Sequence, residues 1–185
     1  TSKFSASASE ILAGAVQDYK RGLIVGDTTT HGKGTVQSLI DLNELIFRQE
    51  NPPKYHGALK ITMQQFYRPN GDSTQRRSVL ADIAMPSITN HMDVGESDLD
   101  YALAFDKVAP ARYSRVEMVN GELVGRLRAA SQQRVQKSDE FAKLAKRIER
   151  YRDFKSRKSQ SVNEEEFLAD RRDLNAEKEE EKQFE

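Results

Sequence analysis

Two stretches of the chain combine residue types and spacing that could support covalent catalysis. The first is the serine-rich run Ser5-Ala6-Ser7-Ala8-Ser9-Glu10, which leads into a helical apolar pattern. A serine at a helix start lies beside free backbone N–H groups and the positive end of the helix dipole, and both stabilise an oxyanion. This position suits a nucleophile. Serine is also a preferred N-cap, so Ser5 or Ser7 with Glu10 could equally close the helix as a capping box.

The second stretch is His31-Gly32-Lys33-Gly34-Thr35-Val36-Gln37, where a lysine stands between two glycines just before an expected strand. Glycine on both sides lets other backbone approach closely. A phosphate-binding loop is not indicated, because Gly34 stands where that loop needs Ser or Thr and no helix follows. Lys33 could accept a proton from a serine in its neutral form, which burial and a nearby helix N-terminus favour. The alternative is a solvated lysine in a turn.

Hydrophobic periodicity predicts the elements that must position these residues. A helix is expected over residues 6–19, because four apolar side chains share one helical face. These are Ile11, Leu12, Ala15 and Val16. Short apolar runs between turn residues predict strands, which cover residues 23–25, 35–42, 58–67 and 79–85. Helices are expected further on, over residues 99–105, 123–137 and 139–158, with a third long one starting near Ser161.

Composition divides the chain into three parts. Residues 1–90 mix short apolar runs with Gly, Pro and Thr, residues 91–120 form a loop-rich, partly acidic connector, and residues 121–185 are almost entirely helical in pattern. The predicted fold class is therefore α+β, with a helix and a mixed sheet followed by a helical C-terminal domain.

Length and charge exclude several classes of function. With 185 residues of which 37% are hydrophobic, the chain can bury one modest core or two small ones. Lys plus Arg and Asp plus Glu both number 29, so no bulk field attracts nucleic acid or an anionic membrane. There is no apolar run long enough to span a bilayer. The chain opens directly on patterned sequence, which suggests a piece cut from something longer.

The absence of cysteine rules out disulfides, thiolate metal sites and a cysteine nucleophile. His56 and His91 are isolated and have no metal-ligand spacing. His31 beside the lysine is expected to be a solvated bystander. We therefore expect no metal and no cofactor.

Taken together, the motifs closely resemble those of the carboxyl-terminal processing peptidases, also called tail-specific proteases, of peptidase family S41. The resemblance spans essentially the whole chain and includes the helical extension typical of the long, periplasmic branch of that family. It is carried by residues 5–15, 17–19, 32–37, 55–62, 66–71, 73–75 and 93–96.

The resemblance implies a role for individual residues. The middle serine of the serine-rich run, Ser7, would be the nucleophile and Lys33 the general base, with Gln37 orienting the lysine. The backbone N–H of Ala8 would supply half of an oxyanion hole. Asp18 matches a helix aspartate implicated in the long branch, but eleven residues of helix separate it from Ser7 by about 16 Å, so a structural role is expected.

The resemblance also implies an organisation. Residues 1–90 would be the C-terminal part of the peptidase core, residues 91–120 a connector, and residues 121–185 the helical C-terminal domain. The other half of the oxyanion hole and a PDZ domain that reads apolar C-terminal tails of protein substrates would lie upstream. The isolated 185 residues are therefore expected to show little or no activity, and the location implied is periplasmic.

A second class of function competes with the peptidase. In it the chain is a non-catalytic helical binding or scaffold module, and the serine-rich run is only a helix cap.

Overall fold

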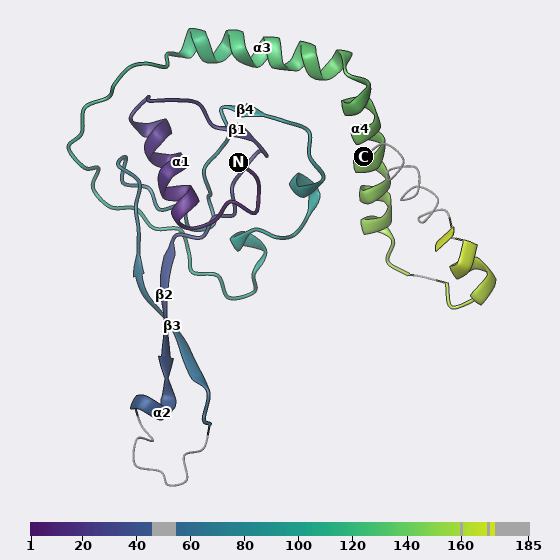
Figure 1. Ribbon diagram of the computed structural model, residues 1–185, viewed down its shortest axis with the longest axis horizontal. Helices are drawn as coiled ribbons and strands as arrows, with labels where there is room; N and C mark the ends of the chain where they lie inside the picture. Colours follow the sequence, from purple (N-terminus) through teal and green to yellow (C-terminus); the bar gives the residue numbers. More distant parts are fainter. Residues whose placement is uncertain (46–54, 160, 170, 173–185) are drawn as a thin grey trace. The chain divides into compact units, whose positions relative to one another are not determined.

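The computed structural model describes residues 1–45, 55–159, 161–169 and 171–172 (Figure 1). Helices and small sheets alternate in the first half and helices follow in the second, which confirms the predicted α+β class. The elements in order are α1 (Ala8–Asp18), β1 (Val25–Gly26), β2 (Thr35–Asp41), α2 (Leu42–Leu45), β3 (Ala58–Gln65), β4 (Ile83–Ala84), η1 (Ile88–His91), η2 (Glu96–Asp98), α3 (Gly121–Lys137) and α4 (Asp139–Ser156).

The named strands of the described residues form two sheets of two strands each. β1 pairs in parallel with β4, with Val25 opposite Ile83. β2 and β3 run antiparallel as a long hairpin, with a register shift between Val36 and Gln37 (Figure 1). The two hairpin strands were predicted well. The strands predicted over residues 23–25 and 79–85 are shorter in the structure, where β1 and β4 have two paired residues each.

Helix α1 begins two residues later than predicted and buries a different face. Its buried residues are Glu10, Ala13 and Gly14, spaced so that they share one side of the helix. Ile11 and Leu12, which the periodicity placed on the core side, are 49% and 68% exposed. The small side chains let α1 lie close to its neighbours, and Ala13 packs in the main buried cluster with Ile24 and Val79.

Residues 99–105 do not form the predicted helix. A short 3-10 turn, η2, precedes them and the segment then continues as irregular chain. Within this segment the Leu103 carbonyl accepts the Gln75 side-chain amide at 3.2 Å, and directly after it Ser73 N–H donates to the Asp106 carbonyl at 3.1 Å and Val108 N–H donates to the Gly71 carbonyl at 2.9 Å. The Tyr67 hydroxyl donates to the Asp106 carboxylate at 2.7 Å, which lowers the pKa of Asp106.

The helices α3 and α4 lie close to their predicted positions. Asn120 caps α3 by accepting the Leu123 N–H at 2.8 Å, as expected of an N-cap asparagine. The chain divides into two compact units, Thr1–Ile148 and Glu149–Glu185, and residues 164–169 form a further helical segment within the second. The strongly charged end over 177–185 lies outside the described residues. Among the helices described, none has the length and apolarity that a membrane crossing requires.

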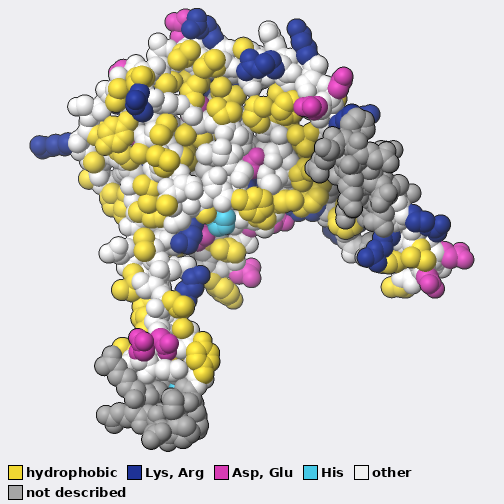
Figure 2. Space-filling view, in the orientation of Figure 1, with side chains coloured by type: hydrophobic (Ala, Val, Ile, Leu, Met, Phe, Trp, Pro, Cys, Tyr) yellow, Lys and Arg dark blue, Asp and Glu magenta, His cyan; other side chains and the backbone are white. Residues whose placement is uncertain are grey.

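Large apolar side chains are prominent on the surface of the first unit (Figure 2). Leu39 of β2 is 72% exposed and Met63 of β3 is 57% exposed, so the hairpin carries apolar side chains outward. Phe4, just before the serine-rich run, is 63% exposed. The buried core of this unit is correspondingly small and rests partly on buried polar residues, of which Glu10, Thr74 and Gln75 are fully inaccessible.

Candidate active site

Ser7 stands at the start of α1 in a backbone conformation that few residues adopt. Its φ is 55° and its ψ is −112°, whereas an ordinary N-cap residue is extended. A positive φ in a residue other than glycine costs about 1–3 kcal/mol and persists only where the surroundings impose it. Such sharp turns into a helix expose the side chain of a nucleophilic serine in other hydrolases. The conformation of Ser7 therefore favours a role beyond that of a simple cap.

The backbone N–H of Ser7 donates to the carboxylate of Glu10, which is 0% exposed. One oxygen, Oε2, accepts the Ser7 N–H at 3.0 Å and the Lys33 N–H at 2.9 Å. The other, Oε1, accepts the Gly32 N–H at 2.7 Å and the Thr30 hydroxyl at 2.5 Å. A buried carboxylate needs several such donors to be stable away from water. Glu10 thus joins the helix start to the lysine loop.

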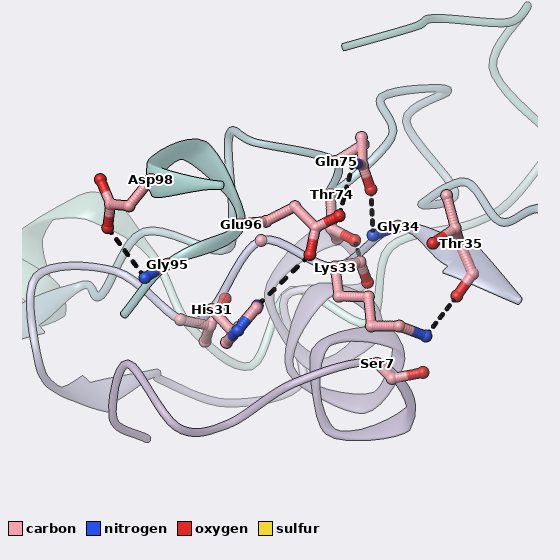
Figure 3. A network of polar contacts seen from close by, with 12 residues as sticks. Ser7, His31, Lys33, Gly34, Thr35, Thr74, Gln75, Gly95, Glu96 and Asp98 are labelled. Atoms are coloured by element: carbon pink, nitrogen blue, oxygen red, sulfur yellow. Dashed lines mark hydrogen bonds and ion pairs between the residues drawn. The ribbon is translucent and has the colours of Figure 1, made fainter. Parts of the chain in front are cut away.

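These bonds bring the serine and the lysine together. Because the backbone nitrogens of Ser7 and Lys33 each lie within 3.0 Å of the same carboxylate oxygen, they are no more than about 6 Å apart. A further hydrogen bond joins the two stretches two residues before Ser7 and Lys33, where the His31 N–H donates to the Ser5 carbonyl at 3.0 Å. In Figure 3 the Lys33 amine and the Ser7 hydroxyl point to the same side of the network.

The lysine loop, residues 31–34, packs against the segment Ser73–Val79. Arg76 N–H donates to the Gly32 carbonyl at 2.8 Å, and the Thr74 hydroxyl donates to the Lys33 carbonyl at 3.3 Å. Gly34 N–H donates to the Gln75 side-chain oxygen at 2.9 Å. The main chain of the loop is therefore held from both sides, by Glu10 and by this segment.

The flanking glycines are required by this packing. A Cβ on Gly34 would lie 2.6 Å from the backbone nitrogen of Gln75 and 2.6 Å from the Ser73 hydroxyl oxygen, closer than real Cβ atoms approach such neighbours. Gly32 has a φ of 93°, and its Cβ would lie 2.8 Å from the Ser78 hydroxyl oxygen. The close approach expected of the two glycines is thus present, and its purpose is to seat the lysine loop.

We expect Gly34→Ala to destabilise the chain by about 1–3 kcal/mol, because the new methyl group overpacks a rigid contact with backbone. Urea unfolding measures the loss. Gly125→Ala is the matched control: no described residue lies within 4 Å of the position that its Cβ would take, and alanine is preferred to glycine inside the helix α3. Equal stability of the two variants would contradict the packing described for Gly34.

Three further groups of the predicted site are the Lys33 amine, the Ala8 backbone N–H and the Gln37 side chain. The Lys33 amine donates to the Thr35 carbonyl at 2.7 Å, which fixes the end of its flexible side chain. Ala8 is the first residue of α1, so its N–H is one of the helix-start donors that have no acceptor within the helix. Gln37 is exposed on β2, and no hydrogen bond joins its side chain to Lys33 within the described residues.

Asp18 lies at the other end of α1 from Ser7. Its carboxylate receives two bonds from the guanidinium of Arg68, at 2.5 and 3.0 Å, and both side chains are largely buried. A two-point contact of this kind fixes orientation. Asp18 therefore anchors the end of the helix and is not brought to the serine.

His31 is more enclosed than the expected solvated residue. Its side chain is 24% exposed, and its Nδ1 lies 3.8 Å from a carboxylate oxygen of Glu96, too far for a hydrogen bond (Figure 3). Within the described part of the chain, His, Asp and Glu side chains form no group of three that could hold a metal ion.

Three buried or half-buried residues of the site, Glu10, Gln75 and Glu96, were not given these roles by sequence reasoning. Glu10 was weighed only as part of a helix cap. Its signal in the sequence is the capping-box spacing from Ser7, whereas its burial becomes visible in the structure. Gln75 and Glu96 lie in stretches that carry the family resemblance, but their contacts were not predicted because their partners lie more than twenty residues away.

Comparison with known proteins gives two family matches, which follow each other along the chain. Residues 1–85 match the family model of peptidase family S41, and residues 89–185 match the C-terminal domain of tail specific protease (DUF3340). The chain is 41% identical over 163 residues to the tail-specific protease of Haemophilus influenzae, covering 87% of this chain and 23% of that protein.

Two other relatives carry related names. The carboxy-terminal-processing protease of Bartonella bacilliformis is 42% identical over 101 residues, covering 51% of this chain and 20% of the relative. The chloroplastic C-terminal processing peptidase of Tetradesmus obliquus is 35% identical over 81 residues, covering 44% and 15%. The chain thus spans less than a quarter of the length of each of these relatives.

Proposed function

Because this chain belongs to peptidase family S41, in its tail-specific protease branch, we propose that it carries the catalytic serine and lysine of a serine endopeptidase. The observation that supports the proposal is the shared carboxylate oxygen of Glu10, which accepts the backbone N–H groups of both Ser7 and Lys33. A structural helix cap needs no such link to a lysine loop.

The proposed reaction proceeds through an acyl-enzyme. The Ser7 hydroxyl oxygen attacks the scissile carbonyl carbon while the neutral Lys33 amine takes the hydroxyl proton. The oxyanion that forms accepts a hydrogen bond from the Ala8 N–H at the positive end of α1. Lys33 then gives its proton to the leaving amine, and a water molecule deprotonated by Lys33 hydrolyses the ester. Gln37 is proposed to orient the lysine, on the resemblance alone.

The proposal extends to substrates and setting. Substrates would be proteins with apolar C-terminal tails, read by a PDZ domain elsewhere in the full-length protease, and the enzyme would act in the periplasm. The division at residues 90 and 120 stays a prediction. The apolar surface of the hairpin, with Leu39 72% exposed, is consistent with further protein packing there.

A serine-directed phosphonate probe tests the proposal. In the full-length protease the probe should label Ser7, whereas the isolated 185 residues should react at least about a hundredfold more slowly, since loss of one oxyanion donor alone has that effect. Mass spectrometry of the labelled peptide locates the site, and cleavage of an unfolded protein with an apolar C-terminus is followed in parallel.

Two results would oppose this proposal. Absence of labelling at Ser7 in the full-length protease would favour the non-catalytic binding or scaffold module. Equal labelling and cleavage by the isolated chain would show that the 185 residues contain the complete catalytic machinery.

A further inference from the structure

We propose that Glu96 is a positioning residue for Lys33, acting through the Gln75 side chain, so that the C-terminal domain segment supports the lysine loop of the peptidase. The inference rests on the proposed function for its catalytic consequence. Glu96 lies in η2, within the residues that match the C-terminal domain, while Lys33 and Gln75 lie in the peptidase part.

The Gln75 amide is the link between the two parts. It is 0% exposed, and its oxygen accepts the Gly34 N–H at 2.9 Å, directly after Lys33 in the chain. Its nitrogen donates to the Glu96 carboxylate at 2.9 Å and to the Leu103 carbonyl at 3.2 Å (Figure 3 shows the first of these). With two acceptors for its nitrogen and a donor for its oxygen, the amide has one possible orientation.

Loss of the Glu96 carboxylate would therefore alter the position of Lys33. One N–H of a fully buried amide would remain without an acceptor, which is costly enough for the side chain to move or turn over. Either change disturbs the acceptor of Gly34 N–H, which seats the residue next to Lys33. A second bond joins the same two segments, because the backbone N–H of Glu96 donates to the His31 carbonyl at 2.8 Å, and this bond is retained when the side chain of Glu96 is replaced.

The route passes through Gln75 rather than through the His31 ring. The carboxylate of Glu96 lies within hydrogen-bond distance of the Gln75 nitrogen, whereas it is 3.8 Å from the His31 Nδ1. Removing the imidazole alone should therefore have little effect.

The experiment uses the full-length protease and variants at position 96. We expect Glu96→Ala to lower kcat by about tenfold or more while KM changes less than about twofold, because the buried donor loses its partner but the substrate contacts do not. Glu96→Met, which keeps the length and lacks the acceptor, should behave alike. Glu96→Gln offers an amide oxygen to Gln75 and should retain at least about a third of the rate.

Hydrogen exchange supplies a readout that does not depend on catalysis. Backbone amides of residues 32–36 should exchange at least about tenfold faster in Glu96→Ala and Glu96→Met than in the wild type, with no change in α1. Asp98→Ala is the matched control, since this carboxylate lies in the same turn and accepts the nearby Gly95 N–H. It should leave both readouts unchanged, as should His31→Ala.

The outcomes separate the two proposals. Unchanged exchange and unchanged kcat in both Glu96→Ala and Glu96→Met would overturn the positioning role. A loss as large in His31→Ala would move the route to the imidazole and also overturn it. If wild-type cleavage proves independent of Ser7, the peptidase proposal fails, and exchange at residues 32–36 still decides whether Glu96 supports the loop.

Discussion

Ser7→Ala should abolish peptide hydrolysis by the full-length protease while the fold remains intact. Alanine lacks the hydroxyl oxygen that attacks the substrate, so turnover should fall more than about a thousandfold. The backbone N–H that donates to Glu10 is retained, and loss of a serine cap costs only about 1 kcal/mol. Cleavage of an unfolded protein measures the rate, and circular dichroism checks the fold.

Ser9→Ala provides the control for this loss. It makes the same substitution two residues later in the same run, at an exposed position of α1, and should stay within about threefold of the wild-type rate. Turnover of Ser7→Ala within tenfold of wild type would refute Ser7 as the nucleophile.

Lys33→Arg should be as inactive as Lys33→Ala, although it keeps the positive charge. A guanidinium stays protonated under all working conditions and cannot accept the serine proton. The loss expected for a missing general base is about a hundredfold to ten-thousandfold in kcat. Steady-state kinetics of both variants on the same substrate measure it.

The matched control is Lys60→Arg, which makes the same exchange on the exposed strand β3, away from the loop. It should cleave at the wild-type rate. Activity in Lys33→Arg together with inactivity of Lys33→Ala would show that position 33 supplies charge and not a base, and would remove the acyl-enzyme scheme described for the pair.

Local pattern was sufficient for much of the fold. The strand β3 alternates apolar and polar residues, β2 is a short run between turn residues, and the helices α3 and α4 carry long periodic patterns, so each was predicted within a few residues. The segment over 99–105 was assigned wrongly as a helix. Its apolar residues follow helical spacing, but its backbone takes part in a long-range hydrogen bond, in which the Leu103 carbonyl accepts the side-chain amide N–H of Gln75.

The candidate site was predictable only in part. The two stretches were noticed because a serine at a helix start and a lysine between glycines are visible in the sequence, and the resemblance to the peptidase family then singled out Ser7 and Lys33, whose roles stay predictions. The hydrogen bonds that join the segments of Ser7 and Lys33 were not visible in the sequence. The carboxylate of Glu10 accepts hydrogen bonds from residues up to 23 positions away, and the backbone of Ser7 has a positive φ. Such contacts depend on the folded chain and leave no local pattern.

The hydrogen bonds around Gln75 also bear on where the peptidase part ends. The two family matches meet between residues 85 and 89, which suggests two modules separable at that point. A protein truncated there would lose both acceptors of the Gln75 amide and the pairing of Gly71 with Val108. A peptidase segment that keeps these bonds therefore has to extend past the boundary between the two family matches to about Val108, and the residues in between belong thermodynamically to the part that precedes them.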